Sequence, residues 1–252
     1  MDKNANQFLC ELYRRMPVDI NGPYLNLTCG QFHRKHRFLF EFYEDNYNSL
    51  LPADPCAEIL DVGFGFGMFM VFMRQNGYKN ISGVEYNPIQ AENAKKMGFR
   101  AEMITDLPEY LKNNRQRFDV IHASNVVEHF PKYDLIELFD LLRDALKDKG
   151  KLIVVVPNIA GIRGVYSRYL VLGHETGLAE VSLRQIFQVC DFKEINIFSS
   201  KIKPRLRIKN IIMIFFQGIL SFFVRAVDYL YLGVNRPNCL GMYLFGIGTK
   251  KS

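Results

Sequence analysis

The chain has 252 residues, 48% of them hydrophobic, which is enough to bury one sizeable core, and we expect one domain with additional segments. Its five cysteines are odd in number, widely spaced and free of any Cys-x-x-Cys pair, which argues against a disulfide framework or a zinc site and fits a reducing, cytoplasmic setting. The polar start of the chain leads into no apolar core of the signal-peptide type, and 32 basic against 26 acidic residues is too modest an excess to indicate a DNA partner.

Two N-terminal segments are expected to be helical, Phe8–Arg15 and Gln31–Ser49, because their apolar side chains recur at roughly helical spacing. Residues 1–54 would then form a helical cap. Two interpretations of the second helix stay open. It packs against the rest of the domain, or it forms a lid over a substrate that is lined by His33, Arg34, His36 and Arg37.

From about residue 57 onward, short β-branched runs alternate with longer helical patterns, which is typical of βαβ units. The expected strands are Glu58–Val62, Ile81–Glu85, Arg100–Ile104, Phe118–Ala123, Lys151–Val156, Glu194–Phe198 and Met242–Ile247. The expected helices are Met68–Asn76, Pro88–Met97, Tyr133–Lys147 and Ser182–Cys190. The fourth and fifth strands are apolar on both faces, which predicts the centre of a sheet, and the last two strands are expected to form an antiparallel edge. The predicted class is α/β, a doubly wound, mostly parallel seven-stranded sheet formed by residues 55–200 and 239–252.

The first strand runs directly into three glycines at alternate positions, Gly63, Gly65 and Gly67. Such a turn lets a ligand approach the main chain, and the helix that follows presents free N–H groups to a negatively charged group. The spacing differs from the dinucleotide pattern Gly-x-Gly-x-x-Gly, because the third glycine comes one residue early. Asp61 would repel a pyrophosphate but suits the ammonium group of an amino-acid ligand.

The next strand ends in Glu85, 20 residues after Gly65, where a ribose diol would need a bidentate acceptor. We therefore predict that Glu85 binds the ribose. The next residue, Tyr86, is placed to cover an adenine ring.

These motifs, together with Thr105-Asp106-Leu107 and Phe118-Asp119-Val120-Ile121, resemble the class I S-adenosylmethionine-dependent methyltransferases over about residues 55 to 198. The resemblance implies a Rossmann-like fold with S-adenosylmethionine as cofactor. It also implies that the glycine turn takes the methionine end, Glu85 takes the ribose and Asp106 meets the adenine amino group. The full predicted cofactor site is Asp61, Gly63, Phe64, Gly65, Gly67, Glu85, Tyr86, Asp106, Leu107 and Asn125.

The segment Ser124–Phe130 follows the fourth strand, at the sheet edge where open α/β folds bind ligands. It resembles the Glu-His motif of small-molecule methyltransferases, which include enzymes of ubiquinone synthesis and many glycan methyltransferases. In the ubiquinone type, an additional acid helps to bind a metal, and Asn125 takes its place here, so no metal site is predicted. His129 is the candidate base that accepts a hydroxyl proton, because imidazole titrates near neutral pH, and the alternative is a purely packing role.

Residues 201–238 form a predicted insertion before the last strand. Five basic residues, Lys201 to Lys209, precede the fourteen mostly apolar residues Ile211–Val224, which are shorter than the roughly 20 residues of a membrane-spanning helix. The segment is expected to be a helical hairpin or cover that packs on the sheet or forms a homodimer face. The alternative is an interfacial helix within 201–234 at an anionic membrane surface, which would make the protein peripheral on the inner face.

The predicted function is methyl transfer from S-adenosylmethionine to oxygen of a saccharide or another small molecule, with a lipid-linked acceptor as one option. A catalytically silent binding protein with the same fold is the alternative, and an RNA methyltransferase is a third class. Intact glycines and Glu85 favour the enzyme.

Overall fold

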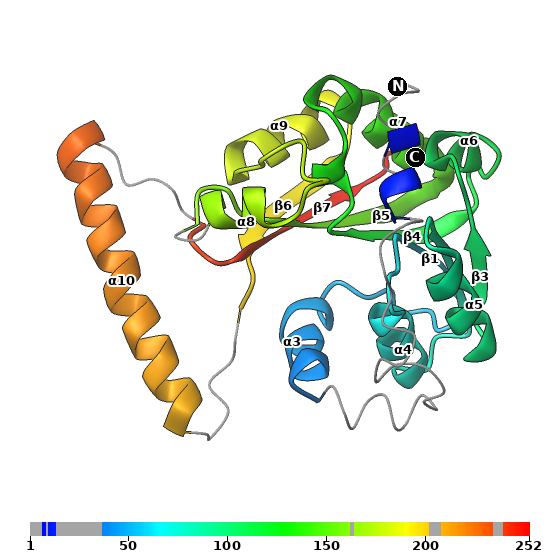
Figure 1. Ribbon diagram of the computed structural model, residues 1–252, viewed down its shortest axis with the longest axis horizontal. Helices are drawn as coiled ribbons and strands as arrows, with labels where there is room; N and C mark the ends of the chain where they lie inside the picture. Colours follow the sequence, from blue (N-terminus) through cyan, green and yellow to red (C-terminus); the bar gives the residue numbers. More distant parts are fainter. Residues whose placement is uncertain (1–6, 9, 14–36, 162–163, 202–207, 234–238) are drawn as a thin grey trace.

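The computed structural model describes residues 7–8, 10–13, 37–161, 164–201, 208–233 and 239–252. Seven strands form one sheet in the order β3-β2-β1-β4-β5-β7-β6 (Figure 1). The strands are β1 (Glu58–Val62), β2 (Asn80–Glu85), β3 (Arg100–Met103), β4 (Phe118–Ser124), β5 (Leu146–Pro157), β6 (Lys193–Ser199) and β7 (Tyr243–Thr249). The first five are parallel, and β7 is antiparallel to both β5 and β6. The predicted α/β class, the central place of β4 and β5 and the antiparallel edge are confirmed.

Helices cover both faces of this sheet, and each face has its own apolar core. One core contains side chains of α6 (Leu107–Lys112), α7 (Leu135–Ala145) and α9 (Glu180–Val189). The other contains side chains of α3 (Arg37–Tyr47), α4 (Met68–Gln75) and α5 (Pro88–Lys96). Because the parallel strands are buried on both sides, their near-continuous apolar runs follow directly from this two-sided cover.

The N-terminal part is described only in pieces, which are helical at residues 7–8 and 10–13 and in α3. In α3, Phe40 and Tyr47 are 2% and 1% exposed, so this helix packs on the domain as the first interpretation predicted. Asn46 donates from Nδ2 to the Lys201 carbonyl and accepts from the Lys201 N–H, which ties α3 to the chain after β6. The lid interpretation falls on residues 33–36 and the side chain of Arg37, which lie outside the described residues.

Several boundaries differ from the prediction. The helix predicted to reach Lys147 ends at Ala145, because Leu146 already pairs with Phe118 as part of β5. The prediction missed α6, whose signals are the capping residue Asp106 and Pro108 in its first turn. It also missed the short helix α8 (Gly164–Leu170) and the single turns η1 (Val127–His129) and η2 (Lys132–Asp134).

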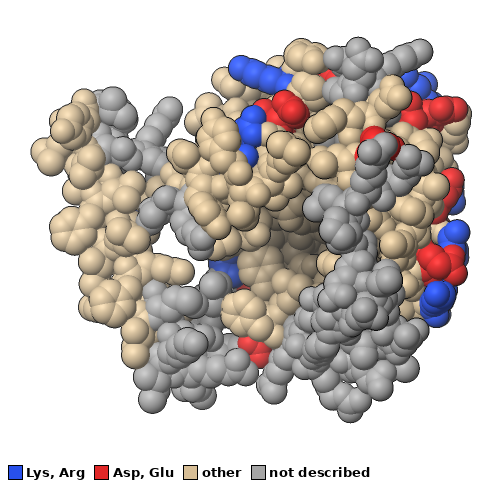
Figure 2. Space-filling model, viewed as in Figure 1, with Lys and Arg blue, Asp and Glu red and all other residues tan. Residues whose placement is uncertain are grey.

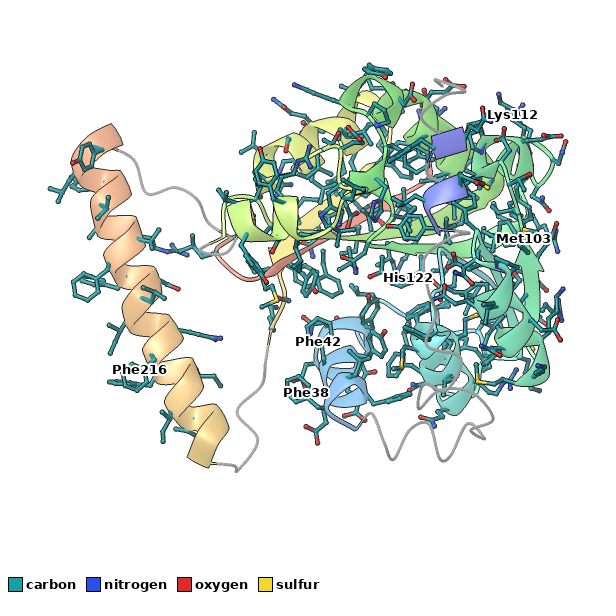
Figure 3. All side chains as sticks on the ribbon, viewed as in Figure 1. Phe38, Phe42, Met103, Lys112, His122 and Phe216 are labelled. Carbon is teal, nitrogen blue, oxygen red and sulfur yellow. The ribbon has the colours of Figure 1, made fainter. Side chains whose placement is uncertain are left out.

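The insertion is a single helix, α10 (Ile208–Leu232), which stands apart from the sheet body in Figure 1. Most of its described apolar side chains are exposed, among them Phe216 at 62%, which points away from the body in Figure 3. The predicted hairpin or cover on the sheet is therefore wrong. The argument that the segment is too short to span a membrane is corrected as well, since Ile214–Tyr231 is long and apolar enough by length and composition. The apolar run considered in the sequence ended at Val224, whereas α10 continues to Leu232.

Candidate active site

A pocket of about 620 Å³ lies at the carboxyl ends of β1, β2 and β4, which is the usual ligand site of an open α/β sheet. The glycine turn, the end of β2, the start of η1 and part of α8 form its walls. Aromatic side chains supply much of the lining, and none of the described lining residues is Lys or Arg. Figure 2 shows that the face viewed is hollowed at its centre, with most charged side chains at its rim.

The turn between β1 and α4 adopts a backbone that favours glycine. The φ angles of Gly63, Gly65 and Gly67 are 63°, 55° and 73°, in the left-handed region. A Cβ on Gly63 would lie 2.6 Å from Cγ2 of Val126, whereas a Cβ on Gly65 would project into open space. Gly63 and Gly65 line the pocket, but Gly67 does not. Gly67 sits at the N-cap of α4, and its contact with the cofactor stays a prediction.

Glu85 ends β2 with a carboxylate that is 7% exposed and lines the pocket. It accepts backbone N–H groups from Gly65, Tyr86 and Asn87 at 2.9, 2.8 and 3.1 Å. Burial raises the pKa of Glu85, although the three N–H donors oppose this shift. The predicted ribose ligand therefore has a second role, since it holds the glycine turn against the end of β2.

Asp61 presents an unfilled acceptor to the pocket. Its Oδ1 accepts from His122 Nδ1 at 2.7 Å, while Oδ2 has no hydrogen-bond partner among the described residues. Burial raises the pKa of Asp61, and the neighbouring His122 opposes that shift. A buried carboxylate oxygen without a donor is costly. An ammonium group bound in the pocket would supply the missing donor, so this site fits the methionine end of S-adenosylmethionine.

The remaining predicted cofactor residues divide into two groups. Phe64, Tyr86, Leu107 and Asn125 line the pocket as predicted. Asp106 does not, since its Oδ1 caps α6 by accepting the Glu109 N–H at 2.9 Å, and the residue lines a separate hollow. The cap uses Oδ1 of the carboxylate, and the contact of Asp106 with adenine stays a prediction.

His129 lines the pocket and is 7% exposed. Its Nδ1 lies 2.8 Å from the Gly173 carbonyl, and its Nε2 lies 2.9 Å from the Tyr13 hydroxyl. Burial lowers the pKa of His129 to about 4. Tyr13 comes from the N-terminal part, where Asn87 donates to its carbonyl at 2.9 Å. Sequence reasoning missed Tyr13, because 116 residues separate it from His129 and no local motif marks it.

Glu128 and His174 lie beside His129. The Glu128 carboxyl is 3% exposed and has no hydrogen-bond partner among the described residues, and burial raises its pKa to about 8. Ligand atoms of Glu128, His129 and His174 all lie within 4.8 Å of one another. Two ligand atoms of a tetrahedral Zn²⁺ site lie only about 3.4 Å apart, so this group would have to contract to hold zinc. The expectation that no metal binds stays a prediction.

Comparisons with known proteins also indicate a methyltransferase. Residues 34–195 match the model of a methyltransferase domain family. An S-adenosylmethionine-dependent methyltransferase from Archaeoglobus fulgidus has 20% identity and a TM-score of 0.61, and the match covers 87% of this chain and 98% of that one. A possible histamine N-methyltransferase from Thermotoga maritima has 18% identity and a TM-score of 0.58, covering 88% and 94%.

A third solved structure contains a ligand related to the cofactor. Phosphoethanolamine N-methyltransferase 2 of Haemonchus contortus, solved with phosphomonomethylethanolamine and S-adenosylhomocysteine, has 16% identity and a TM-score of 0.54, covering 90% of this chain and 61% of that one. No curated protein sequence matches the chain. The solved structures share the fold, and the family model spans more than half of the chain. With a pocket at the expected sheet edge and an open acceptor for the methionine end, the chain belongs to the methyltransferase domain family and is an S-adenosylmethionine-dependent methyltransferase.

Proposed function

We propose that this enzyme methylates an oxygen of a saccharide or another small hydroxyl compound. The observation that carries the proposal is the state of His129 in the pocket. The Gly173 carbonyl can only accept, so the hydrogen of that bond belongs to Nδ1, and Nε2 is left with its lone pair. A hydroxyl must lose its proton when its oxygen becomes an ether, and Nε2 is placed to accept that proton.

The cofactor supplies a methyl group that is already activated on a sulfonium. The acceptor oxygen gains this methyl group, and its proton passes to His129 Nε2, directly or through the Tyr13 hydroxyl. The Gly173 carbonyl then stabilises the imidazolium through Nδ1–H. Because the pKa of His129 is lowered to about 4, the ring is neutral at neutral pH, but the same burial makes it a weak base. Its contribution to the rate is therefore expected at the lower end of the roughly 10²–10⁴-fold range of general bases, and positioning of the reactants contributes further.

The lining of the pocket supports an uncharged acceptor. Tyr13, Tyr43 and Tyr243 contribute aromatic rings with hydroxyl groups, which suit a sugar or a hydroxylated ring. A phosphate would be expected to meet Lys or Arg, and the described lining contains neither.

We also propose that α10 lies in the surface of a membrane, with the enzyme on the cytoplasmic side and a lipid-linked acceptor within reach. At about 100° per residue, Phe215, Phe216 and Phe223 share a broad apolar side of α10, while Gln217 and Ser221 share the opposite side. On the face shown in Figure 2, the described surface of α10 carries no charged side chain. An amphipathic helix with a basic flank, here Lys201 to Lys209, is the form of an interfacial helix.

Sedimentation with liposomes tests the membrane proposal. Vesicles that contain anionic lipid should sediment the protein, and salt should release part of it, since each nearby basic residue contributes about 1 kcal/mol that salt screens. Changing Lys201, Lys203, Arg205, Arg207 and Lys209 to Gln should weaken this binding and leave cofactor affinity unchanged. Protein that stays in the supernatant at low salt would refute the proposal. Release by detergent alone would instead indicate that α10 spans the bilayer.

Incubation with cofactor labelled in its methyl group tests the acceptor. The protein is mixed with fractionated extracts of its own source, and the labelled product is identified by mass spectrometry. An O-methylated small molecule is the expected product, and label on nitrogen would overturn the role of His129. Absence of binding at millimolar cofactor would favour the silent binding protein, while labelled RNA with strongly salt-dependent affinity would favour an RNA methyltransferase.

A further inference from the structure

Two buried residues outside the glycine turn, His122 and Tyr47, form a hydrogen-bonded line that ends at Asp61. Asp61 and His122 are paired neighbours on the parallel strands β1 and β4. Their side chains therefore share the sheet face that α3 and α4 cover, and Figure 3 shows His122 between the sheet and these helices. His122 Nδ1 donates to Asp61 Oδ1 at 2.7 Å, and the Tyr47 hydroxyl on α3 lies 2.9 Å from His122 Nε2. None of the three residues is more than 2% exposed.

The direction of both hydrogen bonds follows from chemistry. An ionised Asp61 can only accept, so the proton of the first bond belongs to His122 Nδ1, and in the neutral ring Nε2 accepts from Tyr47. Burial raises the pKa of Tyr47 well above its ordinary value, so the hydroxyl keeps its proton and can donate. Phe69 stacks on the His122 ring at 3.8 Å between centroids and 23° between planes. The imidazole is thus held by Asp61 at one nitrogen, Tyr47 at the other and Phe69 on its face.

The end of this line points to a ligand. Asp61 lines the pocket, and its Oδ2 has no hydrogen-bond partner among the described residues. The methionine end of the cofactor carries an ammonium, which is the cofactor's only cationic N–H donor. We propose that His122 and Tyr47 are positioning residues that orient Asp61 so that its Oδ2 receives this ammonium. Tyr47 would then contribute to cofactor recognition without touching the cofactor itself.

A pair of ligands separates the amino-acid end of the cofactor from the rest. S-adenosylhomocysteine and 5′-methylthioadenosine share the adenosine and the thioether, but only the first carries the amino-acid end with its ammonium and its carboxylate. Isothermal titration calorimetry with both ligands is compared for the wild type, Tyr47→Phe and His122→Phe. We expect His122→Phe to weaken S-adenosylhomocysteine about tenfold or more and Tyr47→Phe to weaken it about threefold to tenfold, because a charge-assisted and a neutral hydrogen bond are removed in turn. Both variants should bind 5′-methylthioadenosine within about twofold of the wild type.

Two further variants separate positioning from a general structural role. His122→Asn should recover most of the affinity for S-adenosylhomocysteine, because its amide N–H can replace Nδ1–H as donor to Asp61. Ser82→Ala removes another buried hydrogen bond to β1, from Ser82 Oγ to the Ile59 carbonyl, and should leave the ratio of the two affinities unchanged. An equal loss for both ligands, or no loss for either, would overturn the proposal. If His122→Phe fails to fold, the ratio of the affinities for the two ligands in Tyr47→Phe and His122→Asn tests the proposal instead. Neither result depends on the identity of the methyl acceptor.

Discussion

Replacing Glu85 tests the cofactor pocket at a side chain that also holds the glycine turn through backbone hydrogen bonds. In the structure, its carboxylate accepts three backbone N–H groups and also lines the pocket. Glu85→Ala therefore removes the acceptor of the turn and the predicted acceptor of the ribose hydroxyls together. Glu85→Gln keeps the length of the side chain, but it removes the charge and turns one acceptor atom into a donor.

The expected magnitudes differ for binding and for folding. A charged acceptor for two ribose hydroxyls is worth about 1–3 kcal/mol, so Glu85→Ala should weaken cofactor binding by about 5- to 150-fold. Leaving buried N–H groups without an acceptor costs about 1–3 kcal/mol for each group that water cannot reach, so the free energy of unfolding should fall as well. Glu85→Gln should lower stability less, because its amide oxygen still accepts from part of the turn.

Calorimetry with adenosine and 2′,3′-dideoxyadenosine separates the two effects. The second ligand lacks both ribose hydroxyls, so a direct ribose contact predicts that Glu85→Gln weakens adenosine and leaves dideoxyadenosine nearly unchanged. The double-mutant cycle built from these four affinities gives the coupling energy between Glu85 and the diol. A coupling energy near zero would refute ribose binding and leave Glu85 only its role in holding the turn.

Three further substitutions test the rest of the site. Gly65→Val should reduce cofactor affinity at least about tenfold by calorimetry, because a branched side chain enters the pocket from a residue in the left-handed region. The control Gly77→Val introduces similar backbone strain away from the pocket, at φ 89°, and should bind the cofactor normally. His129→Asn should keep cofactor affinity but lower turnover by up to about 10²-fold, the lower end of the range for general bases. Its pH–rate profile should lack the fall that protonation causes in the wild type as the pH drops through about 4, and equal turnover would leave only a packing role. The pKa of Glu128 is raised from 4.5 to about 8, so folding favours its protonated form, and the free energy of unfolding of the wild type should fall by up to about 5 kcal/mol between pH 5 and 8. Urea unfolding in the presence of EDTA should show that Glu128→Gln flattens this fall. Parallel pH curves for the two proteins would contradict the prediction.

Local patterns were sufficient for the sheet and for the turn. The run from Ile59 to Gly67 contains a buried strand and a turn whose glycines adopt positive φ, and both follow from neighbouring residues in the chain. Asp106 shows what a short motif leaves open. The motif is compatible with an adenine contact and with a helix cap, and the structure shows that Oδ1 of its carboxylate accepts the Glu109 N–H at the start of α6. For α10, the pattern established an apolar helical segment but not its length or its exposure.

The alternation of strands and helices, the glycine turn and the acid at the end of β2 could all be predicted from the sequence, because each depends on residues close together in the chain. Which distant side chains meet in the pocket depends on the folded domain. Tyr13 reaches His129 across 116 residues, and Tyr47 reaches Asp61 through His122 on the neighbouring strand. Neither contact leaves a periodic signal, because strand order and helix packing bring these side chains together, and those depend on burial of apolar surface over the whole domain.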